Sequence, residues 1–156
     1  MLIFLESDRD NLTYVGNTAV SFTCGLPEHY DLRPGMQKGK WYLGLIELAL
    51  PAIKRGQKAD RLYVSCSACE LSCVGNSYRP IIAAFSLGEI KRDSCIRFPS
   101  VQYVPLRVTS VSELTLEVCG SDHRPLPELN TRDNPRQAAR CSLALKWMPN
   151  TSPWQP

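Results

Sequence analysis

The stretch Lys40–Pro51, KWYLGLIELALP, is the most apolar part of the chain, and its conformation decides the fold class. A helix would place Trp41, Leu45 and Leu48 on one face, and Leu, Glu and Ala are good helix formers. Gly44 weakens a helix, however, and the run is short for one. As a strand, it divides into two largely apolar faces, one with Trp41, Leu43, Leu45, Glu47 and Ala49, the other with Tyr42, Gly44, Ile46, Leu48 and Leu50. That pattern favours a central strand that is buried on both sides.

The rest of the chain supports the strand interpretation. Seven further short runs are separated by turns rich in Pro and Gly, at residues 2–5, 18–26, 61–70, 81–87, 101–108, 113–119 and 139–148. Several of these runs alternate apolar and polar residues, as a half-buried strand does. Pro105 interrupts one run and predicts an edge position or a bulge there. About eight short strands with regular turn signals predict an all-β sandwich or barrel.

The strand count and the loops predict an architecture. Eight antiparallel strands with long loops favour a single jelly-roll β-sandwich, in which two four-stranded sheets lie face to face. A lipocalin-like barrel would use tighter hairpins, and a parallel α/β sheet would need crossover helices that the sequence lacks. We expect one jelly-roll domain over residues 1–147 and a Pro-rich C-terminal tail over residues 148–156.

Charge and hydropathy argue against several classes of function. The net charge of +3 is mild, whereas a nucleic-acid-binding protein carries a clustered basic face. The apolar start Met1–Leu5 is followed at once by charged residues, so it does not predict a signal peptide. No window approaches a membrane span. We expect a soluble, non-secreted protein without a specific nucleic-acid partner or membrane insertion, and reduced thiols for its seven cysteines.

Cys66, Cys69 and Cys73 form the one cluster with metal-like spacing. Zinc would need a fourth ligand, from Cys24 or His123, and a second knuckle of similar spacing is absent. The odd spacing within a strand predicts that Cys66 and Cys69 point to opposite faces. A redox Cys-x-x-Cys would be expected at the start of a helix in a βαβ unit, which the sequence does not show. We predict no metal site and no cofactor, and zinc binding remains the alternative to free thiols.

No pattern predicts catalysis. His29 and His123 lie in loop-like segments, and Asp122 beside His123 does not make a dyad, because adjacency in sequence does not set the two side chains face to face. The Ser nucleophile elbow and the Gly-rich phosphate loops are absent. Glu47 is a candidate general acid, but such a residue more often pairs with Arg or Lys. The sequence therefore predicts a non-enzyme without catalytic residues.

The order of several short motifs carries a family resemblance. In sequence they are Leu26-Pro27, Asp31-Leu32, Trp41…Glu47…Pro51, Leu62-Tyr63-Val64, Val74-Gly75…Tyr78…Pro80 and Tyr103-Val104-Pro105. This order, over residues 11–147, resembles the penton-type minor capsid proteins of Polinton (Maverick) elements and of related adenovirus-like animal viruses, the adintoviruses among them. The chain departs from that family at the turn CGSDHRPLPE, residues 119–128, and in its additional cysteine cluster.

The resemblance implies a structural protein of the virion capsid. Such a protein is a single jelly roll that forms a homopentamer at icosahedral five-fold vertices, after assembly in the nucleus or cytoplasm. Its implied partners are a double jelly-roll major capsid protein and, as a further candidate, a fibre or spike. Ring closure through one head-to-tail interface requires apolar flanks. We expect loop 121–138 to form a rim of the ring. We expect contacts with neighbouring capsid proteins from the tails 1–17 and 148–156, the latter including Trp154.

A second hypothesis comes from the ligand-binding class. A β-sandwich module can bind carbohydrate or a receptor through a concave aromatic patch with a polar rim. The arrangement of exposed aromatic side chains would distinguish such a module from an assembly protein.

Overall fold

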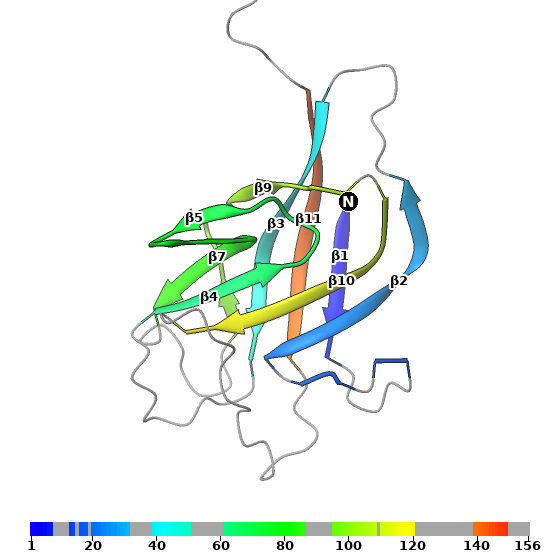
Figure 1. Ribbon diagram of the computed structural model, residues 1–156. Coiled ribbons are helices and arrows are strands. Elements are labelled where there is room, and N and C mark those ends of the chain that lie inside the picture. Colours follow the sequence, from blue (N-terminus) through cyan, green and yellow to red (C-terminus); the bar gives the residue numbers. More distant parts are fainter. Residues whose placement is uncertain are drawn as a thin grey trace, which may run out of the picture.

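The computed structural model is an all-β structure with two main antiparallel sheets and a small hairpin (Figure 1). The structure describes residues 1–7, 13–14, 16–18, 20–31, 39–50, 61–86, 95–108, 110–120 and 139–149, with only the backbone of 27–31. These residues contain eleven strands and no helix. The predicted all-β class is therefore confirmed, whereas the predicted count of about eight strands is wrong.

Each main sheet combines strands from distant parts of the chain. Sheet A has the order β1-β11-β3-β8, with β9 also paired to β3, and contains β1 (Leu2–Glu6), β3 (Gly39–Ala49), β8 (Cys95–Arg97), β9 (Tyr103–Pro105) and β11 (Arg140–Pro149). Sheet B has the order β2-β10-β4-β7 and contains β2 (Ser21–Asp31), β4 (Arg61–Cys66), β7 (Ile81–Ser86) and β10 (Ser110–Cys119). The separate hairpin joins β5 (Ser72–Val74) to β6 (Ser77–Arg79).

One hydrophobic core lies between the two sheets. In Figure 1 the strands of sheet B cross in front of those of sheet A. The largest fully buried side chains come from both sheets and include Phe22, Leu43, Leu45, Leu48, Leu62, Ile82, Leu114, Leu116 and Leu143. The alternation read from residues 18–26 and 113–119 is confirmed, because the apolar set of each run packs in or against this core, and that of the run 139–148 is confirmed as far as Leu145.

The stretch 40–51 contains most of β3, which is a central strand as predicted, with β11 on one side and β8 and β9 on the other. Its pairing with β11 is irregular. Leu45 lies opposite Leu143 and Glu47 lies opposite Ser142, so that Ile46 is an extra residue on β3. This is a β-bulge, and it changes which residues of the strand face the core.

The bulge overturns the division of this strand into two alternating faces. Leu43 and Leu45 face the core before the bulge, and Leu48 and Leu50 face the same core after it. The other face consists of Tyr42, Ile46, Glu47 and Ala49, which are only partly buried, and of the buried Gly44. The prediction of a strand buried on both sides is therefore wrong, and β3 has one buried face and one partly exposed outer face.

Three short strands, β5, β6 and β8, were not predicted from the sequence. The hairpin β5–β6 lies where a break was predicted, and β8 lies in an expected connection. A three-residue strand is too short to display alternation. Gly75-Asn76 is a typical turn pair. It joins the paired residues Val74 and Ser77, and Gly75 adopts a φ of 58° that suits glycine. The edge position predicted by Pro105 is confirmed, because β9 lies along the outer side of β3.

A buried serine extends the pairing of β1 with β11. Ser7 donates its backbone N–H to the Ala139 carbonyl oxygen at 2.8 Å, and its Oγ accepts the Ala139 N–H at 2.8 Å. We expect Ser7→Ala to lower the free energy of unfolding by about 1–3 kcal/mol, because it leaves a buried N–H without its acceptor. Urea unfolding measures the change. The exposed control Ser110→Ala should stay within about 0.5 kcal/mol, and equal effects of the two substitutions would contradict the assignment.

Candidate functional site

The edge strand β1 carries exposed apolar side chains on the outer face of sheet A. Leu2 is 57% and Phe4 72% exposed, whereas Ile3 between them is buried in the core. Successive residues of a strand point to opposite faces, so Leu2 and Phe4 share the outer one. Met1 is also exposed. We call Met1, Leu2 and Phe4 the β1 patch. Neighbouring exposed apolar side chains of this kind often mark interaction sites.

Beside this patch, the outer face of sheet A carries small residues. Leu2 pairs with Ala144, Ala144 with Gly44, and Gly44 with Tyr103, so that one row crosses the sheet. The centre of the row holds only small residues. Val101 covers Gly44, because a Cβ at this position would clash with Cγ1 of Val101. The outer face beside the β1 patch is therefore already filled at Gly44 by a side chain of the same protein.

Two ion pairs neutralise acidic side chains on the same sheet. Nε of Arg140 lies 3.0 Å from a carboxylate oxygen of Glu6, and Nε of Arg97 lies 3.2 Å from one of Glu47. Exposed pairs of this kind contribute little to stability, about 0–1 kcal/mol each. Glu47 is thus paired with an arginine, as predicted for a carboxylate within an apolar strand. The pairing also leaves less charge to oppose an apolar contact.

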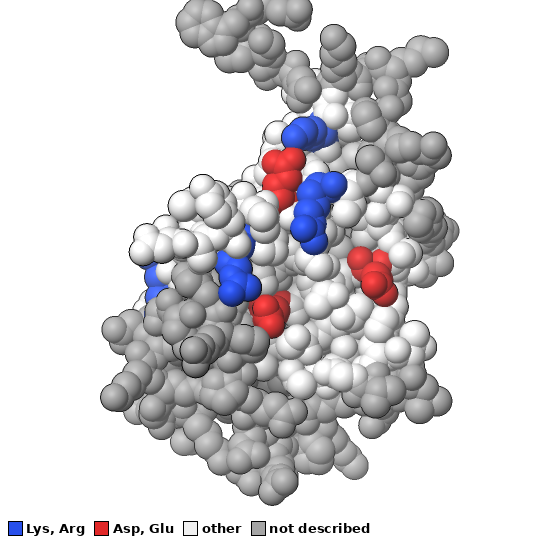
Figure 2. All heavy atoms as spheres, in the orientation of Figure 1, with Lys and Arg blue, Asp and Glu red and all other residues white. Residues whose placement is uncertain are grey.

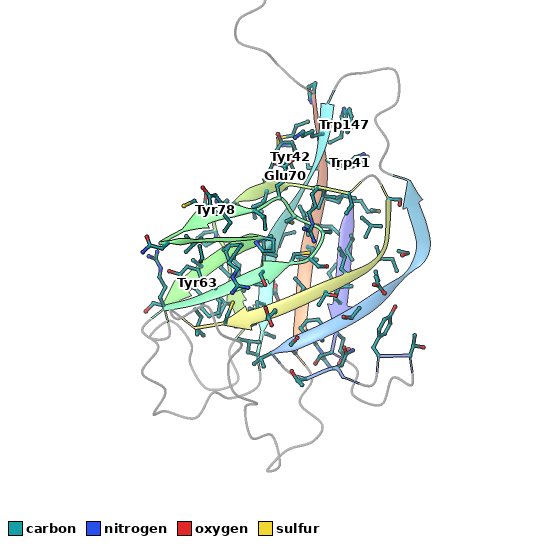
Figure 3. The ribbon with its side chains drawn as sticks, viewed as in Figure 1. Trp41, Tyr42, Tyr63, Glu70, Tyr78 and Trp147 are labelled. Carbon is teal, nitrogen blue, oxygen red and sulfur yellow. The ribbon has the colours of Figure 1, made fainter. Side chains whose placement is uncertain are left out.

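A second exposed apolar spot lies on the hairpin. Leu71 is 55% and Tyr78 70% exposed, and we call them the hairpin patch. The hairpin connects β4 to β7, the edge strand of sheet B, and β7 contacts β3 and β9. The strand β1 forms the other edge of sheet A. The two patches therefore lie on opposite flanks, and Figure 3 shows Tyr78 on the hairpin at the left of the molecule.

Charged residues do not form a continuous patch on the face shown in Figure 2. Blue and red side chains of the described residues are scattered and are separated by uncharged ones. One of the ion pairs joins Nζ of Lys40 to Glu70 at 2.8 Å. This distribution agrees with the mild net charge of the sequence.

Residues Cys66–Glu70 form a tight corner after β4 that bonds to both sheets, and we call it the cysteine corner. Ser67 donates its N–H to the Thr115 carbonyl oxygen in sheet B at 3.0 Å. Glu70 donates its N–H to the Pro105 carbonyl oxygen in sheet A at 2.8 Å. The corner therefore connects the two layers at the point where the chain leaves β4.

The two cysteines of this corner point the same way. The Cys69 N–H donates to the Cys66 carbonyl oxygen at 3.1 Å and closes a turn, and both side chains are fully buried. The prediction that they face opposite ways is wrong, because the turn reverses the chain between them. Interaction between the two thiols lowers the pKa of Cys66 and, together with burial, raises the pKa of Cys69.

The other candidate metal ligands lie elsewhere. The thiol of Cys73 faces solvent on the hairpin, 3.6 Å from the Gly75 carbonyl oxygen. The thiol of Cys24 donates to the Glu6 carbonyl oxygen at 3.2 Å, at the edges of β1 and β2. Within the part of the chain that the structure describes, no three His, Cys, Asp or Glu side chains are grouped as metal ligands.

Some predicted residues lie outside the described part of the chain. These are His123 and Asp122, the loop 121–138, the side chain of His29, and Trp154 in the tail. The expected N-terminal tail 1–17 is partly wrong, because residues 2–6 form β1. At the other end, β11 continues through Pro149.

The exposed β1 patch was the candidate functional feature that sequence reasoning missed. The run Leu2–Leu5 is apolar at every position, whereas an edge strand with one solvated face alternates. Continuous apolar character in so short a strand was therefore the available signal for an outer apolar face.

Comparisons with known proteins give no guide to function. No family model matches the sequence, and no curated protein and no solved structure matches it either. Among the residues described, no helix is both long and apolar enough to span a membrane. The function must therefore be inferred from the geometry of this chain.

Proposed function

We propose that this chain is a single jelly-roll capsid protein of the penton type. It assembles as a homopentamer at icosahedral five-fold vertices and contacts a major capsid protein there. The observation that carries the proposal is the strand order of the two sheets, β1-β11-β3-β8 and β2-β10-β4-β7. The order of sequence motifs described above points the same way.

The eleven strands fit an eight-stranded scheme. The hairpin β5–β6 is an excursion between β4 and β7. Strands β8 and β9 pair with consecutive stretches of β3, residues 47–49 and 42–44, and so act as two halves of one strand. In this scheme the first strand pairs with the last, the second with the seventh, the third with the sixth, and the fourth with the fifth. A long hairpin rolled into two sheets has this pairing, which supports a jelly roll.

Ring assembly needs two different surfaces on each subunit. In a head-to-tail ring, one flank of each copy meets the opposite flank of the next. The β1 patch and the hairpin patch lie on opposite flanks and are both apolar. We therefore assign the ring interface to contact between the β1 patch of one copy and the hairpin patch of its neighbour.

The exposed aromatic side chains favour assembly over carbohydrate or receptor binding. Phe4 and Tyr78 are the two most exposed of the large hydrophobic side chains described. A carbohydrate platform would gather such rings in one concave patch. Here they lie on opposite flanks, an arrangement that suits contact between copies.

The test is the mass of the purified full-length chain in solution. We expect a species of five times the 17.5 kDa chain mass by native mass spectrometry and by sedimentation. A chain that stays monomeric at high concentration, with and without a capsid partner, would overturn the proposal. Binding of that monomer to a glycan array would support the alternative module instead.

A further inference from the structure

The cysteine corner has the geometry of a disulfide precursor. Its closing hydrogen bond between the Cys69 N–H and the Cys66 carbonyl oxygen, at 3.1 Å, is that of a β-turn, which holds the two Cα atoms within about 7 Å. Disulfides span Cα separations of about 4.4–6.8 Å. Both side chains lie fully buried in the same core. We propose that Cys66 and Cys69 are a modification site, a dithiol that peroxide oxidises to an intramolecular disulfide.

Cys66 is the attacking sulfur in this reaction. The neighbouring Cys69 thiol, the Ala68 backbone and the Arg107 guanidinium all favour a negative charge on its sulfur. These groups lower its pKa despite burial. A thiolate is the nucleophilic form of cysteine. Peroxide suits this site because it is small and the two thiols are fully buried.

The reaction balances in two steps. The Cys66 thiolate attacks one peroxide oxygen, the O–O bond breaks, and the departing hydroxide takes the Cys69 proton to form water. Cys66 is then a sulfenic acid. The Cys69 thiolate attacks the Cys66 sulfur and the S–O bond breaks. The departing hydroxide takes up from solvent the proton that Cys66 released on ionising, which forms a second water. The dithiol loses two electrons, and the peroxide gains them.

Other thiols of the chain are less suited to this reaction. Cys95 is exposed, and desolvation and Glu47 raise its pKa to about 11. Burial, with smaller contributions from neighbouring thiols, raises the pKa of Cys141. A thiol with a raised pKa holds less thiolate at neutral pH. Cys73 is exposed on the hairpin and serves as the accessible reference thiol.

Oxidation should stabilise the connection between the layers. The hydrogen bonds of Ser67 to Thr115 and of Glu70 to Pro105 tie the corner to both sheets, so a cross-link inside the corner holds these bonds in place. Closing so short a loop is expected to raise Tm by about 5 °C. Because the disulfide is buried, bulky thiols should reduce it slowly.

The experiment treats the folded full-length chain with hydrogen peroxide, alkylates remaining thiols under denaturing conditions, and cleaves after Arg61 and Glu70. The resulting peptide Leu62–Glu70 contains Cys66 and Cys69 and no other cysteine. We expect this peptide without alkyl groups and two hydrogens lighter than its reduced form. In Cys69→Ser, dimedone should instead trap a sulfenic acid on Cys66. The control Cys73→Ser should form the disulfide as the unaltered chain does.

A second measurement needs no substitution. Calorimetry compares the peroxide-treated chain with a portion of it that is then reduced by dithiothreitol in urea. The rise in Tm should appear only in the oxidised sample. The proposal is overturned if the Leu62–Glu70 peptide remains alkylated at both thiols under peroxide that oxidises Cys73. It is also overturned if Cys66 or Cys69 is found bonded to a different cysteine. Neither result bears on pentamer formation, so the two proposals fail independently.

Discussion

Leu48→Asp is expected to unfold the protein, whereas Ile46→Asp should leave it folded. Leu48 is 1% exposed in the core, and Ile46 is only partly buried at the bulge. Simple alternation would put these two residues on the same face, so the bulge alone separates their fates. A buried carboxylate without a partner costs several kcal/mol, and the whole stability of a domain is about 5–15 kcal/mol. Far-UV circular dichroism and urea unfolding measure the result.

A conservative substitution separates the free-energy cost of burying a charge from the cost of changing the shape of the side chain. Leu48→Met keeps the volume of the side chain and should cost less than about 1.5 kcal/mol. Leu48→Ala and Leu45→Ala should each cost about 2–5 kcal/mol, because both residues fill the same core. Similar stability of Leu48→Asp and Ile46→Asp would show that the strand has no bulge at this position.

Phe4→Glu is expected to convert the proposed pentamer into a folded monomer. Phe4 is 72% exposed in the single chain, so its replacement removes little from the core. In the proposed ring it is the aromatic anchor of the β1 patch, and truncating such a residue costs about 2 kcal/mol or more per interface. Each interface should weaken by roughly 30-fold or more. Sedimentation velocity measures the change, and circular dichroism verifies that the chain remains folded.

The matched control places the same charge elsewhere. Ser112→Glu adds a carboxylate at an exposed position of β10, a central strand of sheet B, and should leave the pentamer intact. Tyr78→Glu should disrupt the ring as Phe4→Glu does. An equimolar mixture of Phe4→Glu and Tyr78→Glu chains keeps one intact pair of patches and should form heterodimers but no rings. If the Phe4→Glu chain and the Tyr78→Glu chain each still formed a pentamer, these patches would not lie in the ring interface.

The sequence predicted those parts of the fold that depend on local pattern. Runs in which every second residue is apolar, such as 113–119, can bury one face only as strands. The edge position of Pro105 and the turn at Gly75 follow from backbone chemistry, since proline lacks an N–H and glycine tolerates a positive φ. The absence of helical periodicity excluded a helical body.

The candidate site was less accessible to sequence reasoning. The cysteine spacing was visible, but the orientation of Cys66 and Cys69 was predicted wrongly, because it depends on a turn that closes through one backbone hydrogen bond. The exposure of Phe4 depends on the position of β1 at a sheet edge. The sequence pattern around an apolar residue is the same whether its side chain is covered or exposed in the folded protein.

By itself, the sequence determined that this chain forms short, amphipathic strands, because side-chain alternation acts between near neighbours. Only the tertiary structure decided how those strands pair, that Ile46 bulges so that Leu45 and Leu48 share one core, and that two thiols meet at a corner between sheets. Each of these depends on partners far along the chain. Strand pairing and bulges arise from hydrogen bonds between segments, and the order of residues along one segment does not specify them.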